Sequence, residues 1–160
     1  MPVTTDTSIQ RGGEWLLASS DAASVFTPER TTDEHRMIAR TAGDFVRNEV
    51  APALDRLERK DWDFARHLLK RCGELGLLGV DVPEAYGGVG LDKVSSLIVS
   101  DQFSRSASFG ATLGGQSNLT VLPLFLFGTE RQKQQYLPRL LTGELVGAYA
   151  LSESGSGSDA

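Results

Sequence analysis

An all-α fold of five to six helices, ending at the first strand of a truncated β domain, is the architecture that the sequence predicts. Apolar residues recur at three- and four-residue steps from about residue 33 to residue 141, which is the period of amphipathic helices. Residues 146–151 then form a short, mostly apolar run that is typical of a strand. Because a lone strand is not stable, we expect the other strands of the β domain to lie outside this sequence.

Composition agrees with one globular domain and excludes several classes of protein. The 160 residues are 40% hydrophobic and 23% charged, which is enough to form a core. The net charge of −5 argues against a nucleic-acid partner, because such proteins carry a basic surface. The single cysteine excludes an internal disulfide, and His35 and His67 are too isolated to indicate a metal site. The longest apolar run, residues 119–127, is much shorter than the roughly 20 residues of a membrane span.

Residues 1–27 are interpreted as a loosely ordered N-terminal arm. They are rich in Ser, Thr, Gly and Asp and lack the apolar block of a signal peptide. Their acidic residues also argue against a transit peptide, so we expect a cytoplasmic location. Trp15 is the candidate for docking this arm, and a disordered tail is the equally weighted alternative.

The first helix is expected to begin after Thr31 or Thr32, either of which can cap it. Asp33 and Glu34 follow in the first turn, where acidic side chains favour the helix dipole. Pro52 should end or kink the helix, because proline removes a helical hydrogen bond. The expected apolar face consists of Met37, Ile38, Ala42, Phe45, Val46 and Val50.

A second helix is expected from about residue 63 to residue 75, with Gly76 as its C-cap. Cys72 lies within its apolar face, which favours a small core residue over the alternative of a reactive thiol. The face consists of Phe64, Leu68, Leu69, Cys72 and Leu75.

Residues 77–91 contain a glycine-rich stretch that is not spaced as a dinucleotide fingerprint, so we expect a tight structural loop. Asp92 is a good N-cap for a third helix whose predicted apolar face is Val94, Leu97 and Ile98. Asp101 falls on that face. The favoured interpretation is an edge position, solvated or paired with Arg105, and the alternative is a functional acid.

Residues 106–115 are small and flexible in composition. Residues 119–127 are apolar nearly all round, which predicts a helix buried on several sides, with Pro123 in its first turn or at a kink. Thr129 and Gln132 have the spacing of a capping box that opens a last helix. This helix should end near residue 143 and bend or restart at Pro138.

The stretch from Ser152 to Asp159 alternates glycine and serine between acidic flanks. Such a composition is typical of a flexible linker. The same stretch follows directly on the predicted strand, where short side chains and backbone N–H groups can form a cradle for an anion or cofactor. The residues alone leave both interpretations open, and no G-x-S-x-G elbow or nucleophile–base set is present.

Four stretches in this order resemble the N-terminal half of the acyl-CoA dehydrogenase family. The resemblance covers residues 28–160, and the approach at residues 26–30 together with residues 140–143 is most similar to the very-long-chain branch. The four stretches are residues 83–90 (PEAYGGVG), 127–133 (FGTERQK), 136–138 (YLP) and 149–159 (YALSESGSGSD).

The resemblance implies an FAD-dependent oxidoreductase of fatty-acid β-oxidation type, a flavoprotein that removes two hydrogens from Cα and Cβ of an acyl-CoA thioester. Residues 28–145 would be its N-terminal helical domain, and residues 146–160 the start of its middle β domain. The implied partners are the acyl-CoA substrate, an electron-transfer flavoprotein as acceptor, and further copies of the chain in a dimer or tetramer. The glutamate base of the family comes beyond Ala160, so no catalytic residue is assigned and residues 1–160 alone are expected to be inactive.

The resemblance also assigns cofactor contacts. Tyr149 and Leu151 match residues that pack on the flavin ring, and Ser152 matches a hydroxyl residue that hydrogen-bonds the flavin near N5. Gly157 and Ser158 match the turn that reaches the FAD phosphate, with Ser158 also near the acyl-CoA. Ser154 stands where the family commonly has proline, which puts the rigidity of this turn in question.

Two other functions stay open at this point. An acyl-CoA oxidase would have the same fold and use oxygen as electron acceptor. A non-catalytic helical interaction domain would keep the scaffold without the site, although the presence of Ser152 and Ser158 argues against it.

Overall fold

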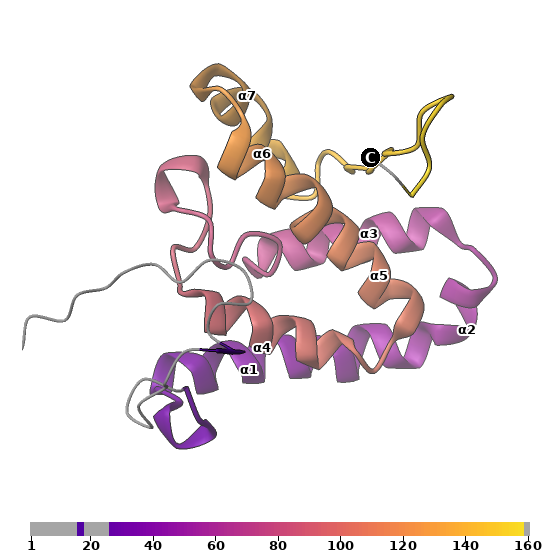
Figure 1. Ribbon diagram of the computed structural model, residues 1–160. Helices are drawn as coiled ribbons and strands as arrows, with labels where there is room; N and C mark the ends of the chain where they lie inside the picture. Colours follow the sequence, from indigo (N-terminus) through magenta and orange to yellow (C-terminus); the bar gives the residue numbers. More distant parts are fainter. Residues whose placement is uncertain (1–15, 18–25, 159–160) are drawn as a thin grey trace, which may run out of the picture. The chain divides into compact units, whose positions relative to one another are not determined.

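The computed structural model describes residues 16–17 and 26–158, so Trp15 lies outside the described residues. The chain divides into two units, residues 1–32 and 33–160. The first unit contains the short 3-10 helix η3 (Pro28–Arg30), where the Thr31 hydroxyl donates to the Pro28 carbonyl oxygen at 2.6 Å. The second unit contains the α-helices labelled in Figure 1.

The first predicted helix continues through its proline by changing its winding. Helix α1 (Asp33–Phe45) passes into a π-helical turn, η4 (Val46–Val50), and then into a 3-10 turn, η5 (Ala51–Ala53), that contains Pro52. Helix α2 (Leu54–Glu58) follows directly. Pro52 therefore alters the helix locally, as predicted. The π-helical turn before it and the 3-10 turn around it accommodate the hydrogen bond that proline cannot make. The predicted apolar face is buried except for Met37, which is 57% exposed.

Helix α3 (Trp62–Glu74) confirms the second predicted helix. The Asp61 side chain caps it by accepting from the Phe64 N–H at 3.0 Å. The chain leaves the helix at Gly76, whose φ of +72° is the left-handed conformation that favours glycine. Cys72 is fully buried, and this burial raises the pKa of its thiol well above the ordinary value. The interpretation of Cys72 as a core residue is thereby confirmed.

The glycine-rich stretch is a structural loop, as predicted, and holds the 3-10 helix η6 (Glu84–Tyr86). Its backbone is tied by hydrogen bonds from Val89 N to Gly79 O at 3.0 Å and from Leu91 N to Val80 O at 2.8 Å. These bonds fold the loop on itself. The loop thus connects α3 to the next helix without forming a phosphate-binding turn.

Helix α4 (Lys93–Phe103) begins as predicted, because Asp92 accepts from the Ser95 N–H at 2.8 Å. Its predicted buried face is wrong at Leu97, which is 62% exposed; the buried residues are Ser95, Val99 and Phe103. Phe103 decides this register, since its ring lies 5.9 Å from that of Phe45 and 6.0 Å from that of Phe109. Asp101 is exposed, in agreement with the solvated interpretation.

A buried histidine links α1 to the start of α4, and these two helices lie side by side (Figure 1). The Nε2 atom of His35 lies 3.0 Å from each carboxylate oxygen of Asp92, and His35 is only 4% exposed. The Ser95 backbone N–H, with help from His35 and the Ser95 hydroxyl, holds the pKa of Asp92 below its ordinary value. The helix cap is therefore also a contact between helices.

Helix α5 (Ala107–Gln116) lies in the stretch of small residues, where composition indicated flexibility. Phe109 and Leu113 bury this helix, and a Cβ atom at Gly110 would lie 2.8 Å from the Phe103 carbonyl oxygen. The small residues thus permit close helix packing, a role that composition does not distinguish from flexibility.

The helix continues as a π-helical turn, η7 (Ser117–Val121), and as α6 (Leu122–Phe127), with Pro123 in the first turn of α6 as predicted. Burial on several sides is wrong for the described residues. Leu126 is 56% exposed and Phe127 84% exposed. An apolar sequence predicts that a face will be covered, but the covering residues need not come from the same stretch of chain.

Helix α7 (Glu130–Leu141) opens with the predicted capping box between Thr129 and Gln132. The helix runs through Pro138 as one element, so the predicted restart is wrong. Burial of Leu137 and Leu140 on either side of Pro138 holds both halves against the core, and this compensates for one missing hydrogen bond.

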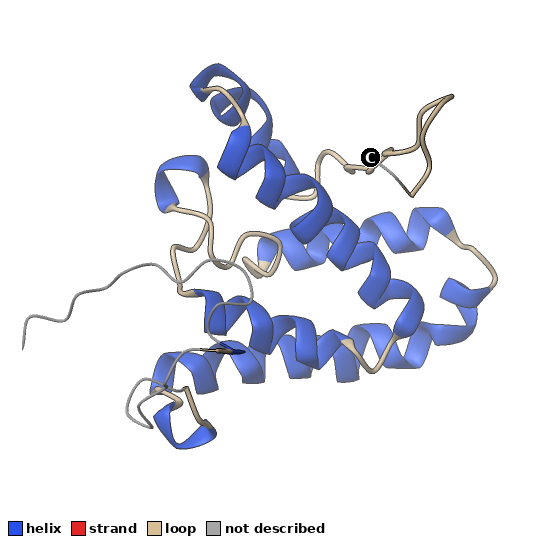
Figure 2. Cartoon of the chain, viewed as in Figure 1, coloured by secondary structure: helices blue, strands red, loops and turns tan. Residues whose placement is uncertain are grey.

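The predicted strand at residues 146–151 is not formed in the described part of the chain. These residues are extended and irregular, and Figure 2 draws them as loop. An isolated antiparallel bridge joins Glu153 to Ser156. The physical reason is that a strand needs a neighbour for its hydrogen bonds, and the described residues offer none there.

Two apolar clusters form the core of residues 33–160, and glycines bring the helices together. One cluster spans α1, α3, α4 and α5, and the other joins α7 to Val82 and Val121. A Cβ atom at Gly73 would lie 2.5 Å from the Thr142 carbonyl carbon and oxygen, so α3 and the end of α7 touch backbone to backbone. Gly143, with φ of +70°, lies similarly against the Leu69 carbonyl oxygen.

We predict opposite effects for alanine at two helical glycines. Gly73→Ala forces the α7 backbone away and should lower the free energy of unfolding by about 1–3 kcal/mol, despite the better helix propensity of alanine. Gly115→Ala meets nothing within 4 Å and should raise it by roughly 0.5–1 kcal/mol. Urea unfolding of both variants checks this, and a Gly73→Ala protein as stable as the parent would contradict the backbone contact.

Candidate functional site

The predicted site residues lie on the segment that leaves α7, residues 145–158, which we call the exit segment (drawn in yellow in Figure 1). Tyr149 is 55% exposed and Leu151 is 48% exposed. Ser152 follows them, also exposed. Two large apolar side chains next to a hydroxyl, all facing solvent, form a surface suited to a ring system with polar edges.

The exit segment is attached to the helices at its beginning. Leu145 N donates to the Arg139 carbonyl oxygen at 3.0 Å. The buried Gln116 amide donates to Leu145 O at 2.9 Å and accepts from Gly147 N at 2.8 Å. Sequence reasoning missed Gln116, because one glutamine after a stretch of small residues has no pattern.

The Gly/Ser stretch forms a tight turn. Glu153 N donates to Ser156 O at 2.8 Å, and Ser156 N donates to Glu153 O at 3.1 Å. The Ser156 hydroxyl is buried and has no hydrogen-bond partner among the described residues. Gly155 and Gly157 face open space, with nothing within 4 Å of where a Cβ atom would be.

This donor set fits an anionic or hydrogen-bond-accepting group. Exposed hydroxyls at Ser152 and Ser158 and open backbone at Gly157 can approach such a group closely. Gly157 and Ser158, the residues predicted for the cofactor phosphate, follow this turn directly, while Asp159 lies outside the described residues. The cradle and the linker both stay predictions for this stretch.

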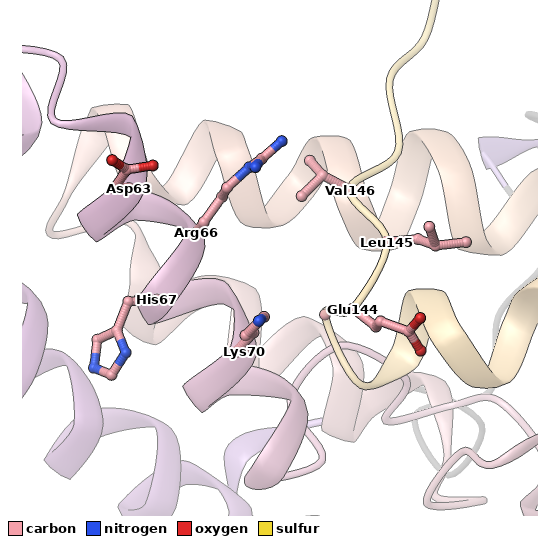
Figure 3. Close-up of a pocket in the computed structure, with 8 residues that line it drawn as sticks. Asp63, Arg66, His67, Lys70, Glu144, Leu145 and Val146 are labelled. Atoms are coloured by element: carbon pink, nitrogen blue, oxygen red, sulfur yellow. The ribbon is translucent and has the colours of Figure 1, made fainter.

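A cavity of about 520 Å³ lies between α3 and the beginning of the exit segment (Figure 3). It contains none of the predicted site residues. Its lining combines charged and polar side chains of α3 with the turn after α7: Asp63, Arg66, His67, Lys70, Gly143, Glu144, Leu145 and Val146.

The lining of this cavity carries two acidic side chains, Asp63 and Glu144, and two basic ones, Arg66 and Lys70. Glu144 accepts from Arg139 Nε at 2.9 Å, and this hydrogen bond holds the pKa of the Glu144 carboxyl below its ordinary value, with a smaller contribution from Lys70. Figure 3 shows Arg66 directed towards Val146 and Asp63 on the same helix. The cavity is therefore an open polar groove of mixed charge.

The described residues hold no group of three or more His, Cys, Asp or Glu side chains placed to bind a metal ion. In the same part of the chain, every helix is too short or too polar to cross a membrane.

A sequence model described as "Acyl-CoA dehydrogenase, N-terminal domain" matches residues 32–144. The chain belongs to the acyl-CoA dehydrogenase family. This match spans α1 to α7 and ends where the exit segment begins. It confirms the family that the four sequence stretches indicated.

Curated acyl-CoA dehydrogenase relatives align over nearly the whole chain. A probable acyl-CoA dehydrogenase of Bacillus subtilis is 48% identical over 152 residues, which are 95% of this chain and 26% of that protein. The rat mitochondrial short-chain specific acyl-CoA dehydrogenase is 37% identical over 151 residues, 94% of this chain and 35% of that protein. The chain thus spans about a quarter to a third of the length of these relatives.

Solved acyl-CoA dehydrogenase structures share the fold. An acyl-CoA dehydrogenase from Bacillus anthracis complexed with FAD has a TM-score of 0.87 and 53% identity, covering 92% of this chain and 25% of that one. The butyryl-CoA dehydrogenase of Megasphaera elsdenii has a TM-score of 0.70 and 30% identity, covering 84% and 35%. The all-α class predicted for the helical domain is confirmed by this agreement.

We predict that a chymotrypsin-type protease cleaves residues 1–160 after Tyr149 much faster than after Tyr136. Both tyrosines are exposed, at 55% and 39%, but Tyr136 lies within α7 and Tyr149 on irregular backbone. A protease binds its substrate as extended chain, which a helix does not offer, so Tyr136 is the matched control. Mass spectrometry of the early fragments reports the order, and equal rates at the two sites would contradict the described exit segment.

Proposed function

We propose that this chain supplies the N-terminal helical domain of an FAD-dependent acyl-CoA dehydrogenase that oxidises the Cα–Cβ bond of an acyl-CoA thioester. The observation that carries the proposal is the family match over residues 32–144, together with the turn at residues 153–156. The FAD complex of the Bacillus anthracis protein supports the cofactor.

The cofactor-facing residues are those of the exit segment. FAD, when bound, supplies an acceptor for the hydride that leaves the substrate β-carbon. Tyr149 and Leu151 pack against its ring, and the Ser152 hydroxyl donates a hydrogen bond to it. Gly157 offers close backbone approach to a phosphate, and Ser158 adds a hydroxyl towards phosphate and substrate.

The proposal also includes the domain boundaries. Residues 28–145 form the helical domain, residues 1–27 precede it as an arm, and residues 146–160 begin a middle β domain. The catalytic base belongs to the part of the relatives that this chain does not cover, so none of the present residues has that role. Two observations support this division of the chain. Phe127 is exposed, and the exit segment has no strand partner among the described residues.

Partners and subclass extend the proposal. One similar structure, described as an electron transferring flavoprotein of Acidaminococcus fermentans, has a TM-score of 0.74 and 35% identity, which supports an electron-transfer flavoprotein as acceptor. A homo-oligomer, dimer or tetramer, and a cytoplasmic location stay predictions.

The Bacillus subtilis relative is longer than the rat short-chain enzyme, since alignments of similar length cover 26% of the former and 35% of the latter. The very-long-chain branch also stays a prediction.

The test uses the full-length protein. It should be yellow as purified, and an acyl-CoA added without oxygen should bleach its flavin absorption. Residues 1–160 alone should give no turnover. A colourless full-length protein that takes up no added FAD would overturn the proposal, and peroxide release with oxygen as sole acceptor would indicate an oxidase.

Ser152 provides a sharper prediction. Ser152→Ala removes one hydrogen-bond donor and should weaken FAD binding by roughly 2- to 10-fold, corresponding to about 0.5–1.5 kcal/mol. Ser152→Thr keeps the hydroxyl and should bind FAD as the parent does. Titration of the apoprotein with FAD, followed by flavin fluorescence, measures both. An alanine variant with unchanged affinity would remove Ser152 from the cofactor site.

A further inference from the structure

Gln116 is a buried polar side chain whose hydrogen-bonding atoms are directed at one piece of backbone. It is 1% exposed and stands where α5 passes into the π-helical turn η7. Its Nε2 donates to Leu140 O at 2.7 Å and to Leu145 O at 2.9 Å. Its Oε1 accepts from Gly147 N at 2.8 Å.

The orientation of this amide follows from its partners. Two carbonyl oxygens can meet only the NH₂ group, and one N–H can meet only the oxygen. The three bonds connect the end of α7 to both sides of Val146. A buried amide in these contacts is costly to leave unpaired, so the geometry holds the backbone of residues 145–147 in one path.

A second contact holds the same place from the other side. A Cβ atom at Gly147 would overlap the side chain of Thr120, which belongs to η7. Gly147 therefore lies directly on the π-helical turn, and Gln116 bonds its N–H. The chain is fixed here two residues before Tyr149 and five before Ser152.

We propose that Gln116 is a positioning residue for the flavin site: it sets the path of residues 145–147 and thereby the placement of Tyr149 and Ser152. This inference rests on the proposed function. Ser152 lies five residues after Gly147, and five extended residues span at most about 17 Å. Because of this distance, a rotation of the chain at Gly147 displaces the Ser152 hydroxyl by several ångströms. A hydrogen bond to the cofactor tolerates only a few tenths of an ångström.

The role differs from that of an ordinary core residue in what it should affect. Gln116→Met keeps the length of the side chain and removes all three hydrogen bonds. Loss of packing would lower stability throughout the domain, whereas loss of positioning acts on the exit segment and on cofactor affinity. Gln116→Glu keeps the acceptor for Gly147 N–H and places carboxylate oxygen against two carbonyls, so it should behave like the methionine variant.

The experiment compares Gln116→Met and Gly147→Ala in the full-length protein, with Gln135→Met as the control, an exposed glutamine of α7. Hydrogen–deuterium exchange of residues 145–149 reports the path of the chain, and FAD titration reports the site. Both test variants should show faster exchange in this segment and FAD affinity lowered by roughly 10-fold or more, while the control matches the parent. Gly147→Ala changes a residue outside the core. If Gln116→Met does not fold, the Gly147→Ala variant therefore tests whether the path of residues 145–147 affects FAD affinity.

Unchanged exchange at residues 145–149 in the test variants would overturn the positioning role. Faster exchange with unchanged FAD affinity would also overturn it, because the path would then not matter to the site. If the parent protein takes up no FAD, the proposed function fails, and exchange alone decides whether Gln116 fixes the exit segment.

Discussion

The contact of α3 with the end of α7, backbone against backbone, is the constraint on which the placement of the exit segment depends. Gly73 admits the Thr142 carbonyl group, and Gly143 turns the chain against Leu69. A side chain at either position would separate the two helices by the thickness of a methyl group or more. The direction in which residue 145 leaves the domain is therefore set by glycines that are not themselves predicted cofactor contacts.

Local signals in the sequence predicted most helix boundaries, because a cap or a left-handed glycine acts within four residues of itself. Asp92 and Thr129 begin helices through their own side chains, and Gly76 ends one through its own φ. Predictions that needed a partner were less accurate. Leu97 was placed on the wrong side of α4, since the packing of Phe103 against two other rings determines that face.

For the candidate site, too, residues marked by a local motif were predicted and a residue that depends on distant partners was not. Resemblance in short motifs predicted Tyr149, Ser152 and the turn after them as cofactor contacts, which are neighbours in the sequence and therefore lie on one segment. Gln116 could not be found, because its function depends on Leu140, Leu145 and Gly147 arriving beside it from residues 24–31 positions later. The missing strand has the same cause, since the residues that would pair with 146–151 are not in the described chain.

The location of the core within the sequence affects the order in which the protein can form. The buried residues of both apolar clusters lie between Ile38 and Leu141, so all of them have been synthesised before the exit segment. The most extensive contact between separate helices joins α1 to α4, which are distant in sequence, so this part of the core can close only after α4 has been made. A ribosome adding residues from the N-terminus would therefore release a finished helical platform first, and later parts of the chain would assemble on a template that already exists.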